Sequence, residues 1–387
     1  MGTSSRDRRI AEIMAKLIKL YKETPKHWEG GILGSMTTTP HPIAVYAYLL
    51  FIHTNYSDKI VFPTLKYFEE ELISDLNKYY GGLTGLLTSG GTESNFLALL
   101  AGRKTARDRN NIVVAPDTAH VSIDKACDIM GCRVIRVETG NKPVDPGKLE
   151  EYIRRYKPFA VVITAGTTER GLVDPVKPVA DIALDTNTYL HVDAAYGGLL
   201  IPHLYRNGYL EHDLKFYEGV SSISIDFHKN GMTPIPSSIL LFSNKEYKRN
   251  VCYKVSYMLS GETCGLLGTR PGGALAATWA IWKYMGWEGF RELSLNMMKL
   301  AIYLYERLNK IKGIIAYKPI LPIIPFTHVN ISYEILLKEL LKRKYYLYKS
   351  PSLKALRIVI MPHTRKKHLD EFLETLEEIL EKSIEKK

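Results

Sequence analysis

The chain has 387 residues, of which 45% are hydrophobic and 24% are charged, and its formal net charge is +11. This composition excludes a disordered chain and allows one large domain with a smaller one beside it. No apolar run approaches the roughly 20 residues needed to cross a bilayer, so we expect no membrane contact. The basic residues are scattered, which favours a solvated surface over a nucleic-acid-binding face.

The cysteines and the amino terminus bear on the compartment. The stretch MGTSSRDRRIAEIM lacks the apolar core of a secretion signal. The four cysteines show neither a CxxC pair nor the Cys/His spacing of a metal site; they are Cys127, Cys132, Cys252 and Cys264. We therefore expect a protein of a reducing cytoplasm with no metal site. Its many Tyr, Ile, Lys and Glu residues suit a thermophile.

The first 50 residues are expected to form an amino-terminal arm. Apolar residues at helical spacing predict an amphipathic helix over residues 7–22, and an arm of this kind often packs on a partner subunit. The Gly- and Pro-rich stretch 30–44 predicts a long irregular segment, which in a compact domain is usually functional or interfacial.

Residues 51–290 alternate between helical and strand patterns and are expected to form the large domain. Helices are predicted over 64–80, 93–107, 121–130, 149–156 and 176–184. Strands are predicted over 85–91, 111–116, 133–138, 159–165, 189–195, 222–226 and 237–243. Apolar strands bounded by helices predict an α/β fold with a mostly parallel, seven-stranded sheet covered on both faces.

The pattern changes over residues 291–387, which are expected to form a small carboxy-terminal α+β domain. The predicted elements are a long helix at 291–311, a strand near 328–333, a helix at 334–343, a strand at 355–361 and a terminal helix at 366–385.

Chemistry is expected just beyond the carboxyl ends of the strands, where open α/β sheets collect ligands. Gly91 and Thr92 follow the first strand and open a helix, whose free backbone N–H groups and hydroxyl could hold a phosphate. His120 follows the next strand at the mouth of another helix. The structural alternatives are an N-capping Thr92 and an ordinary surface histidine.

Two further strand ends carry charge. Asp193 directly follows an apolar strand, and the small residues after it suit a flat ligand lying against the backbone. Lys229, next to His228, has no obvious carboxylate nearby in the sequence, and a desolvated lysine is a nucleophilic amine that can form a Schiff base. A structural ion pair and a surface lysine are the alternatives. Together the four strand ends fit pyridoxal phosphate, which needs an amine, an acid, a ring platform and a phosphate cup.

Several motifs carry a family resemblance. TSGGTESN, AHVSIDKA, GTTERGLVDP, HVDAAYGG and IDFHKNG, in this order, resemble the group II pyridoxal-phosphate-dependent decarboxylases. With GSMTTTPHPIA, LGTRPGGALAATWA and LRIVIMPH, nearly the whole chain resembles the archaeal L-tyrosine/L-aspartate decarboxylase family. The resemblance implies the fold type I (aspartate aminotransferase-like) architecture of the pyridoxal-phosphate-dependent transferases. It also implies a homodimer with active sites at the subunit interface.

The resemblance also assigns roles around the cofactor ring. Lys229 would form the Schiff base, and its neighbour His228 would contact cofactor or substrate. Asp193 would pair with the pyridinium nitrogen. Ala195 would back the ring, and His120 would stack on its opposite face.

Other positions would complete the site. The resemblance implies that Gly91 and Thr92 hold the phosphate and that Thr167 lies beside the ring. Gly268 and Thr269 would reach the phosphate of the neighbouring subunit.

Substrate recognition and proton transfer rest on fewer residues. Arg357 occupies a small-domain position that commonly binds the substrate α-carboxylate in this fold. The acid that reprotonates Cα stays open between His228, Lys229 and a tyrosine of the loop around Tyr253 to Tyr257. Phe227 stands where the family usually has Pro or Thr, which leaves the pocket shape and substrate size open.

The implied activity is decarboxylation of an L-amino acid. L-Aspartate, giving β-alanine for coenzyme A, is favoured, and L-tyrosine, giving tyramine for methanofuran, and L-glutamate are the other candidates. One alternative is a sphingosine-1-phosphate lyase-like carbon–carbon lyase, which shares the strand-end motifs but usually carries a membrane anchor. Another is a catalytically silent nucleic-acid-binding or scaffold protein on the same fold, which would show no cofactor absorbance.

Overall fold

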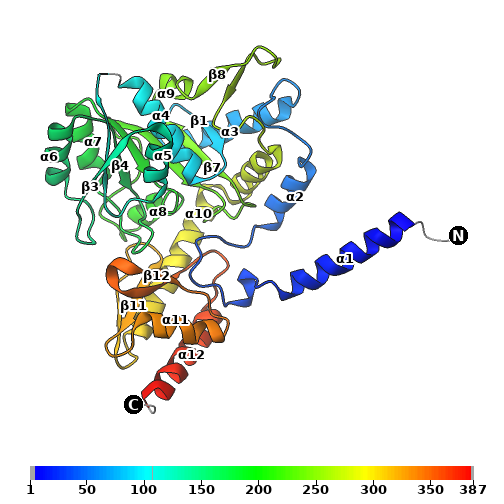
Figure 1. The fold of residues 1–387 in the computed structure, drawn as a ribbon, viewed down its shortest axis with the longest axis vertical. Coiled ribbons are helices and arrows are strands. Elements are labelled where there is room, and N and C mark those ends of the chain that lie inside the picture. Colours follow the sequence, from blue (N-terminus) through cyan, green and yellow to red (C-terminus); the bar gives the residue numbers. More distant parts are fainter. Residues whose placement is uncertain (1–4, 107, 385–387) are drawn as a thin grey trace.

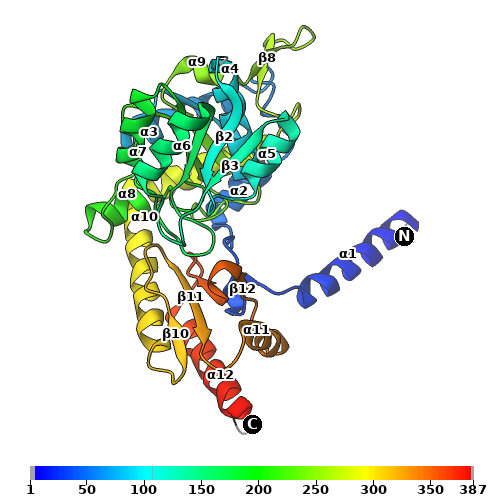
Figure 2. The same ribbon diagram turned by 60° about the vertical axis from the view of Figure 1, so that its left-hand side comes forward.

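The structure, a computed structural model, describes residues 5–106 and 108–384. A seven-stranded sheet and a four-stranded sheet form two bodies, and the long helix α10 (Gly272–Leu308) runs beside both (Figures 1 and 2). Among the described residues, no helix combines the length and the apolar character that a membrane crossing requires.

The larger sheet has the strand order β1-β7-β6-β5-β4-β2-β3. β7 is antiparallel to both of its neighbours, and the adjacent pairs from β6 to β3 are parallel. The mostly parallel seven-stranded sheet is therefore confirmed. The bounds are β1 Thr84–Thr88, β2 Asn110–Pro116, β3 Arg133–Val137, β4 Pro158–Thr164, β5 Tyr189–Asp193, β6 Val220–Asp226 and β7 Ser238–Phe242.

Helices cover both faces of this sheet, which explains why its strands are apolar without alternation. In β2, Val113 packs in a cluster with residues of α4 and α5, whereas Val114 packs in a larger cluster with residues of α6 and α7. The bounds are α3 Pro63–Tyr80, α4 Gly91–Thr105, α5 Ser122–Met130, α6 Pro146–Tyr156, α7 Val176–Asp185, α8 Ile201–Arg206 and α9 Lys245–Arg249. The predicted end of the second helix, Arg107, lies outside the described residues.

The smaller sheet is antiparallel, in the order β10-β11-β13-β12. The strand predicted near 328–333 is wrong in position, because β11 covers Ile323–His328. The sequence argues against a strand at this position because Pro325 lies within it. Proline is uncommon in a strand that, like β11, pairs with another strand on each side. The other bounds are β10 Ile314–Ala316, α11 Tyr333–Lys342, β12 Tyr348–Ser350, β13 Ala355–Val359 and α12 Lys366–Ile384. Glu385, the predicted end of α12, lies outside the described residues.

The helix predicted at 291–311 begins much earlier, since α10 starts at Gly272. Small residues and glycines in its first part hid the helical pattern. The helix contains a break at Gly286, whose φ of 58° lies in the left-handed region that glycine tolerates. Elements that the sequence did not predict are α2 Pro42–Leu50, α8, α9, β8 Cys252–Lys254, β9 Glu262–Cys264, β10 and β12.

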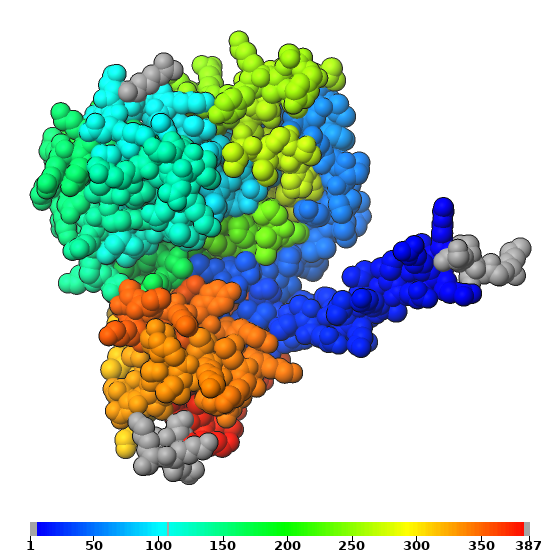
Figure 3. Space-filling model, viewed as in Figure 1, coloured from blue at the N-terminus to red at the C-terminus, as the bar shows by residue number. Residues whose placement is uncertain are grey.

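The amino-terminal segment joins the smaller sheet. Helix α1 (Ser5–Glu23) projects from the body, as Figures 1 and 3 show. The irregular stretch after it is tied down: Gly34 N donates to Tyr346 O at 2.8 Å, and Val359 N donates to Leu33 O at 2.7 Å. A Cβ at position 34 would lie 2.4 Å from the Tyr348 backbone nitrogen, so only glycine fits. This part of the arm is structural and not a free tail.

The cysteines correct the expectation of a reduced chain. Cys127 pairs with Cys132 across the carboxyl end of α5, and Cys252 pairs with Cys264 across the β8–β9 hairpin. CxxC and metal-binding spacings are local sequence signals, whereas these pairs are brought together by a helix end and by strand register. Within the described residues, one group has metal-ligand geometry, Cys252, Glu262 and Cys264, and its two cysteines are the ones in the disulfide.

We expect the buried histidines to make the fold acid-sensitive. Burial, followed by the nearby Arg206, lowers the pKa of His203 to about 4, and its ring packs 4.1 Å from that of Trp287. The unfolded chain binds a proton near pH 6.5, so the stability that His203 contributes is present above this pH and is lost as the pH falls towards 4. His203→Phe should reduce the loss of unfolding free energy between pH 7 and 5 by about 2 kcal/mol.

Thermal unfolding of both proteins at the two pH values measures this effect. His53→Gln, at an exposed position, is the control for the loss of a histidine. An equal drop in melting temperature for wild type and His203→Phe would contradict the assignment.

Candidate active site

A cavity of about 320 Å³ lies at the carboxyl edge of the larger sheet. Because β1, β4, β5 and β6 all end at this edge, the residues that follow these strands converge on it. The cavity is lined by seven of the residues that the sequence predicted for the site, namely Gly91, Thr92, His120, Asp193, Ala195, His228 and Lys229.

The turn before α4 forms one wall of the cavity. Gly90 is the N-cap of α4 and has a φ of 120°, so the sequence expectation of an N-capping Thr92 is wrong. A Cβ at Gly91 would lie 3.2 Å from both Ala195 Cβ and Asp226 Oδ2. The glycines therefore keep space open beside backbone N–H groups at the positive end of a helix dipole, which is where an anion binds.

Asp193 ends β5 and is buried. Asn95 Nδ2 donates to Asp193 Oδ2 at 2.8 Å, and Ala195 N donates to Oδ1 at 3.1 Å. Ser224 Oγ lies 3.5 Å from Oδ1. The carboxylate is thus held by neutral donors, and the structural ion pair considered from the sequence is not among its contacts in the described part of the chain.

Lys229 has a carboxylate partner that the sequence prediction missed. Its Nζ lies 3.0 Å from Oδ2 of Asp226, the last residue of β6. Asp226 Oδ1 is buried without a hydrogen-bond partner. A carboxylate three residues before the lysine, at a strand end like Asp193, was the signal that could have identified it. The pair places an amine and an incompletely satisfied acid at the floor of the cavity.

Two imidazoles flank this floor. His120 Nδ1 accepts from Ser122 N at 3.2 Å and contacts Ser122 Oγ at 2.9 Å. Burial lowers the pKa of His120, which keeps the ring neutral at physiological pH. His228 Nδ1 donates to Ser237 O at 2.7 Å, and its Nε2 lies 3.7 Å from Asp226 Oδ2.

Phe227 does not line the cavity. Its side chain is fully buried and packs edge-on against the rings of Trp282 and Phe290. The sequence left the effect of this bulky residue on pocket shape open. The structure places it in the core, so it acts on packing and not on the volume available to a ligand.

The remaining predicted residues lie elsewhere in this chain. Thr167 lines an adjoining cavity of about 370 Å³, whereas its neighbour Thr168 lines both cavities. Tyr257 is 89% exposed on the β8–β9 hairpin, and Gly268 and Thr269 are also exposed. None of these last three lines the cavity.

Arg357, on β13, is buried and also lies outside the lining of the cavity. Its Nε and Nη1 atoms have no hydrogen-bond partner, and its guanidinium lies 5.5 Å from the ring centre of Tyr348. Burial lowers the pKa of this guanidinium, and the nearby Tyr196, which lines the cavity, opposes that effect. Arg357 is thus a buried guanidinium with two unpartnered nitrogen atoms, electrostatically coupled to one residue of the cavity lining.

The chain is similar to known proteins over most of its length. The model of the pyridoxal-dependent decarboxylase conserved domain matches residues 70–329. The chain belongs to the pyridoxal-dependent decarboxylases. It is 36% identical over 367 residues to a probable L-tyrosine/L-aspartate decarboxylase of Methanosphaera stadtmanae, covering 92% of this chain and 94% of that protein. It is also 36% identical over 375 residues to the L-aspartate decarboxylase of Thermococcus kodakarensis, covering 95% of this chain and 96% of that protein.

A solved structure shares the fold. The sphingosine-1-phosphate lyase of Burkholderia pseudomallei superposes with a TM-score of 0.84 at 25% identity, over 98% of this chain and 91% of that one. The predicted family, fold, decarboxylase class and pyridoxal phosphate cofactor are thus confirmed. The lyase is a structural neighbour, whereas the two sequence relatives are named as decarboxylases.

The lack of a side chain at Gly91 leads to a testable prediction about cofactor binding. Gly91→Ala inserts a methyl group into a 3.2 Å gap, and overpacking of this kind costs about 1–3 kcal/mol, so we expect the affinity for pyridoxal phosphate to fall about tenfold. Titration of the purified protein with cofactor, followed by absorbance, measures the change. Gly147→Ala, in the first turn of α6, is the control and should bind as wild type does. Unchanged affinity in Gly91→Ala would argue against a cofactor in this cavity.

Proposed function

We propose that this decarboxylase acts on L-aspartate, which it converts to β-alanine, and that Lys229 is the amine that holds its cofactor. The observation that carries the proposal is the convergence of Lys229, Asp193 and His120 on one cavity at the amino end of α4. The residue at any single strand end would not be enough to indicate a cofactor site, because each of them alone also has an ordinary structural role.

The residues of the cavity fit pyridoxal phosphate. The Gly90–Thr92 turn offers backbone N–H groups to a phosphate, and the glycines leave room for it. Asp226 Oδ1 is an orphaned buried acceptor beside the Lys229 amine. When bound, the cofactor supplies an electron sink at the substrate Cα. The chain supplies an amine, a phosphate cup and an acid for the ring nitrogen.

Each flanking residue then has a defined task. Asp193, held by neutral donors, would pair with the ring nitrogen. Ala195 would back the ring on one side, and the neutral His120 would pack on the other. Asp226 holds the Lys229 ammonium while the amine is free and can accept its proton. His228 and Lys229 line the cavity and are the candidates of this chain for returning a proton to Cα.

Arg357 is proposed to bind the substrate α-carboxylate. Its unpartnered Nε and Nη1 match a carboxylate in a two-point contact, which would satisfy a group that is otherwise costly to bury. L-Aspartate is favoured because the T. kodakarensis relative is named for it and because the M. stadtmanae relative is named for both amino acids. L-Tyrosine is the second candidate substrate, because the M. stadtmanae relative is also named for it. If L-aspartate is the substrate, the product β-alanine would serve coenzyme A synthesis.

We further propose a homodimer. Helix α1 exposes a row of apolar side chains and projects from the body in Figure 3, the arrangement expected of a helix that packs on a second copy. The exposed positions Tyr257, Gly268 and Thr269 lie outside the cavity of their own chain. In the dimer they would act at the cavity of the partner, where Tyr257 would be a third candidate proton donor.

A thermophilic cell is the proposed setting. Two disulfides are uncommon in a reducing cytoplasm, but intracellular proteins of hyperthermophilic archaea are a known exception. We therefore propose a cytoplasmic enzyme of such an organism, which keeps the predicted compartment and replaces the expectation of reduced cysteines.

Carbon dioxide release from a panel of substrates tests the proposed activity. The cofactor-loaded protein should release it fastest from L-aspartate, and Lys229→Ala should abolish turnover, while Lys177→Ala, on the exposed face of α7, should not change it. L-Glutamate, L-tyrosine and a phosphorylated long-chain base complete the panel. Release from L-tyrosine alone would replace the substrate, cleavage of the long-chain base would favour the lyase, and a fully active Lys229→Ala would contradict the mechanism.

Arg357 has a separate prediction. Arg357→Ala removes one partner of a buried charge contact, which costs about 2–5 kcal/mol, so kcat/KM should fall at least about 30-fold, mainly through KM. Arg357→Lys keeps the charge but not the two-point contact and should recover only part of the loss. Steady-state kinetics on L-aspartate measure both variants, and a wild-type KM in Arg357→Ala would remove this residue from the site.

A further inference from the structure

A buried hydrogen-bonded chain extends from Asp193 into the protein. Asn95 Nδ2 donates to Asp193 Oδ2 at 2.8 Å, and Asn95 Oδ1 lies 2.8 Å from His191 Nε2. His191 Nδ1 lies 2.8 Å from Ser222 Oγ, and the Tyr189 hydroxyl donates to Ser222 Oγ at 3.0 Å. All of these side chains are buried.

The chemistry of the side chains fixes which group donates and which accepts in each of these hydrogen bonds. Asn95 must turn its amide nitrogen to the Asp193 carboxylate, since the reverse orientation would set two acceptors against each other. Asn95 Oδ1 can then only accept, so His191 donates from Nε2. Burial lowers the pKa of His191 to about 4, which leaves the ring neutral and its Nδ1 an acceptor for the Ser222 hydroxyl. Each donor therefore points towards Asp193.

The same amide also reaches His120. Asn95 Nδ2 donates to Ser122 Oγ at 2.8 Å, and Ser122 Oγ lies 2.9 Å from His120 Nδ1. Because the Ser122 hydroxyl accepts from Asn95, its own hydrogen is free for His120. One amide thus orients both the carboxylate that would meet the ring nitrogen and the imidazole that would pack on the ring face.

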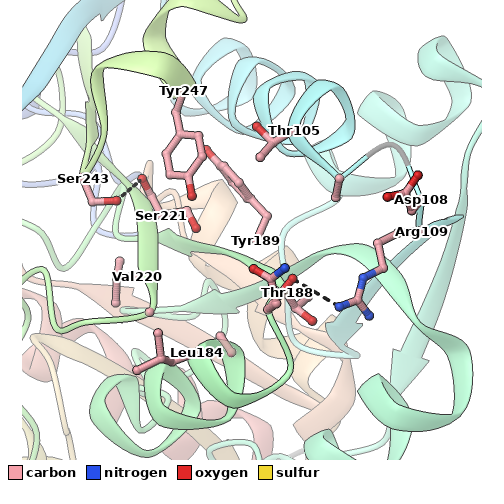
Figure 4. A pocket seen from close by; sticks show the side chains of 14 residues that line it. Thr105, Asp108, Arg109, Leu184, Thr188, Tyr189, Val220, Ser221, Ser243 and Tyr247 are labelled. Atoms are coloured by element: carbon pink, nitrogen blue, oxygen red, sulfur yellow. Dashed lines mark hydrogen bonds between the residues drawn. The ribbon is translucent and has the colours of Figure 1, made fainter.

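Tyr189, the end of the hydrogen-bonded chain farthest from Asp193, lies at a second cavity. Tyr189 lines a cavity of about 280 Å³ at the opposite edge of the sheet, and Figure 4 shows its ring beside Tyr247, with a centroid distance of 5.1 Å. Two of the polar side chains labelled around it bind nearby carbonyl groups: Arg109 donates to Asn187 O at 3.3 Å, and Ser243 Oγ donates to Ser221 O at 3.3 Å. The hydrogen-bonded chain therefore ends at Tyr189, whose ring forms part of the wall of this cavity.

We propose that Asn95 and His191 are positioning residues that set the charge and orientation of Asp193 and the orientation of His120. The inference rests on the proposed function, because it assigns Asp193 to the cofactor ring. Asn95 acts directly on the carboxylate, and His191 acts through Asn95 by holding its amide in the required orientation. Such outer hydrogen bonds strengthen one another in a low-dielectric interior, so their removal acts at the site and not only on folding.

Asn95→Ala is the first test. Removing an outer partner of a functional group typically costs about 10–100-fold in activity, and we expect a fall of this size in kcat with KM changed less than about threefold. The visible absorbance of bound cofactor, followed as a function of pH without substrate, should shift its midpoint. Ser94→Ala removes buried hydrogen bonds at the adjacent position of α4, to Thr88 and Ser238, and is the structural control that should leave both properties unchanged.

A second pair of variants keeps the test valid if Asn95→Ala fails to fold. His191→Gln places an amide N–H near the position of Nε2 and should retain the wild-type absorbance profile and kcat. His191→Phe has similar bulk without the donor and should reproduce the Asn95→Ala effects. Rescue by the glutamine variant alone is a result that a purely structural role would not give.

The outcomes separate the two claims. A wild-type protein that binds no pyridoxal phosphate overturns the proposed function. A wild-type protein that binds cofactor and turns over, together with Asn95→Ala and His191→Phe variants of unchanged kcat and absorbance profile, overturns the positioning role alone. Equal losses in His191→Gln and His191→Phe also overturn it, since the donated hydrogen bond would then not matter.

Discussion

Two carboxylates at the ends of neighbouring parallel strands impose the main constraint on this structure. Asp193 ends β5 and Asp226 ends β6, and both are almost fully removed from water. Buried charges of equal sign are tolerated only where donors or cations compensate them. Asp226 is compensated by Lys229, and Asp193 by the Asn95 amide and a backbone N–H. The active-site geometry follows from how each charge is satisfied.

This division explains how one cavity serves two tasks. The partners of Asp193 are neutral hydrogen-bond donors and form no ion pair with it, so under the proposed function the carboxylate is available to a positively charged ring nitrogen. The cationic partner of Asp226 is Lys229, which would have to leave this contact in order to hold the cofactor as proposed, and Asp226 Oδ1 already lacks a partner. The first acid is thus fixed in place, whereas the second belongs to a contact that the proposed function would require to open.

The sequence predicted the larger sheet well because its signals are local. Buried strands appear as short apolar runs, and their carboxyl ends mark the site by topology, which is why Asp193 and Lys229 could be identified. Asn95 was missed because its importance depends on which side chains the fold brings within hydrogen-bond distance, whereas Asp226 was missed although it stands at a strand end three residues before Lys229. The start of α10 and the disulfide-linked hairpin were missed for a related reason: glycine-rich and exposed segments obtain their structure from contacts distant in sequence.

The identity of the amine in the cavity is the central claim, and one measurement tests it directly. The holoprotein is treated with borohydride, which fixes the cofactor to the amine that carries it, and the modified peptide is located by mass spectrometry. The account predicts a single cofactor label on Lys229. A label on another lysine, or a protein that takes up cofactor and retains none after reduction, would contradict it.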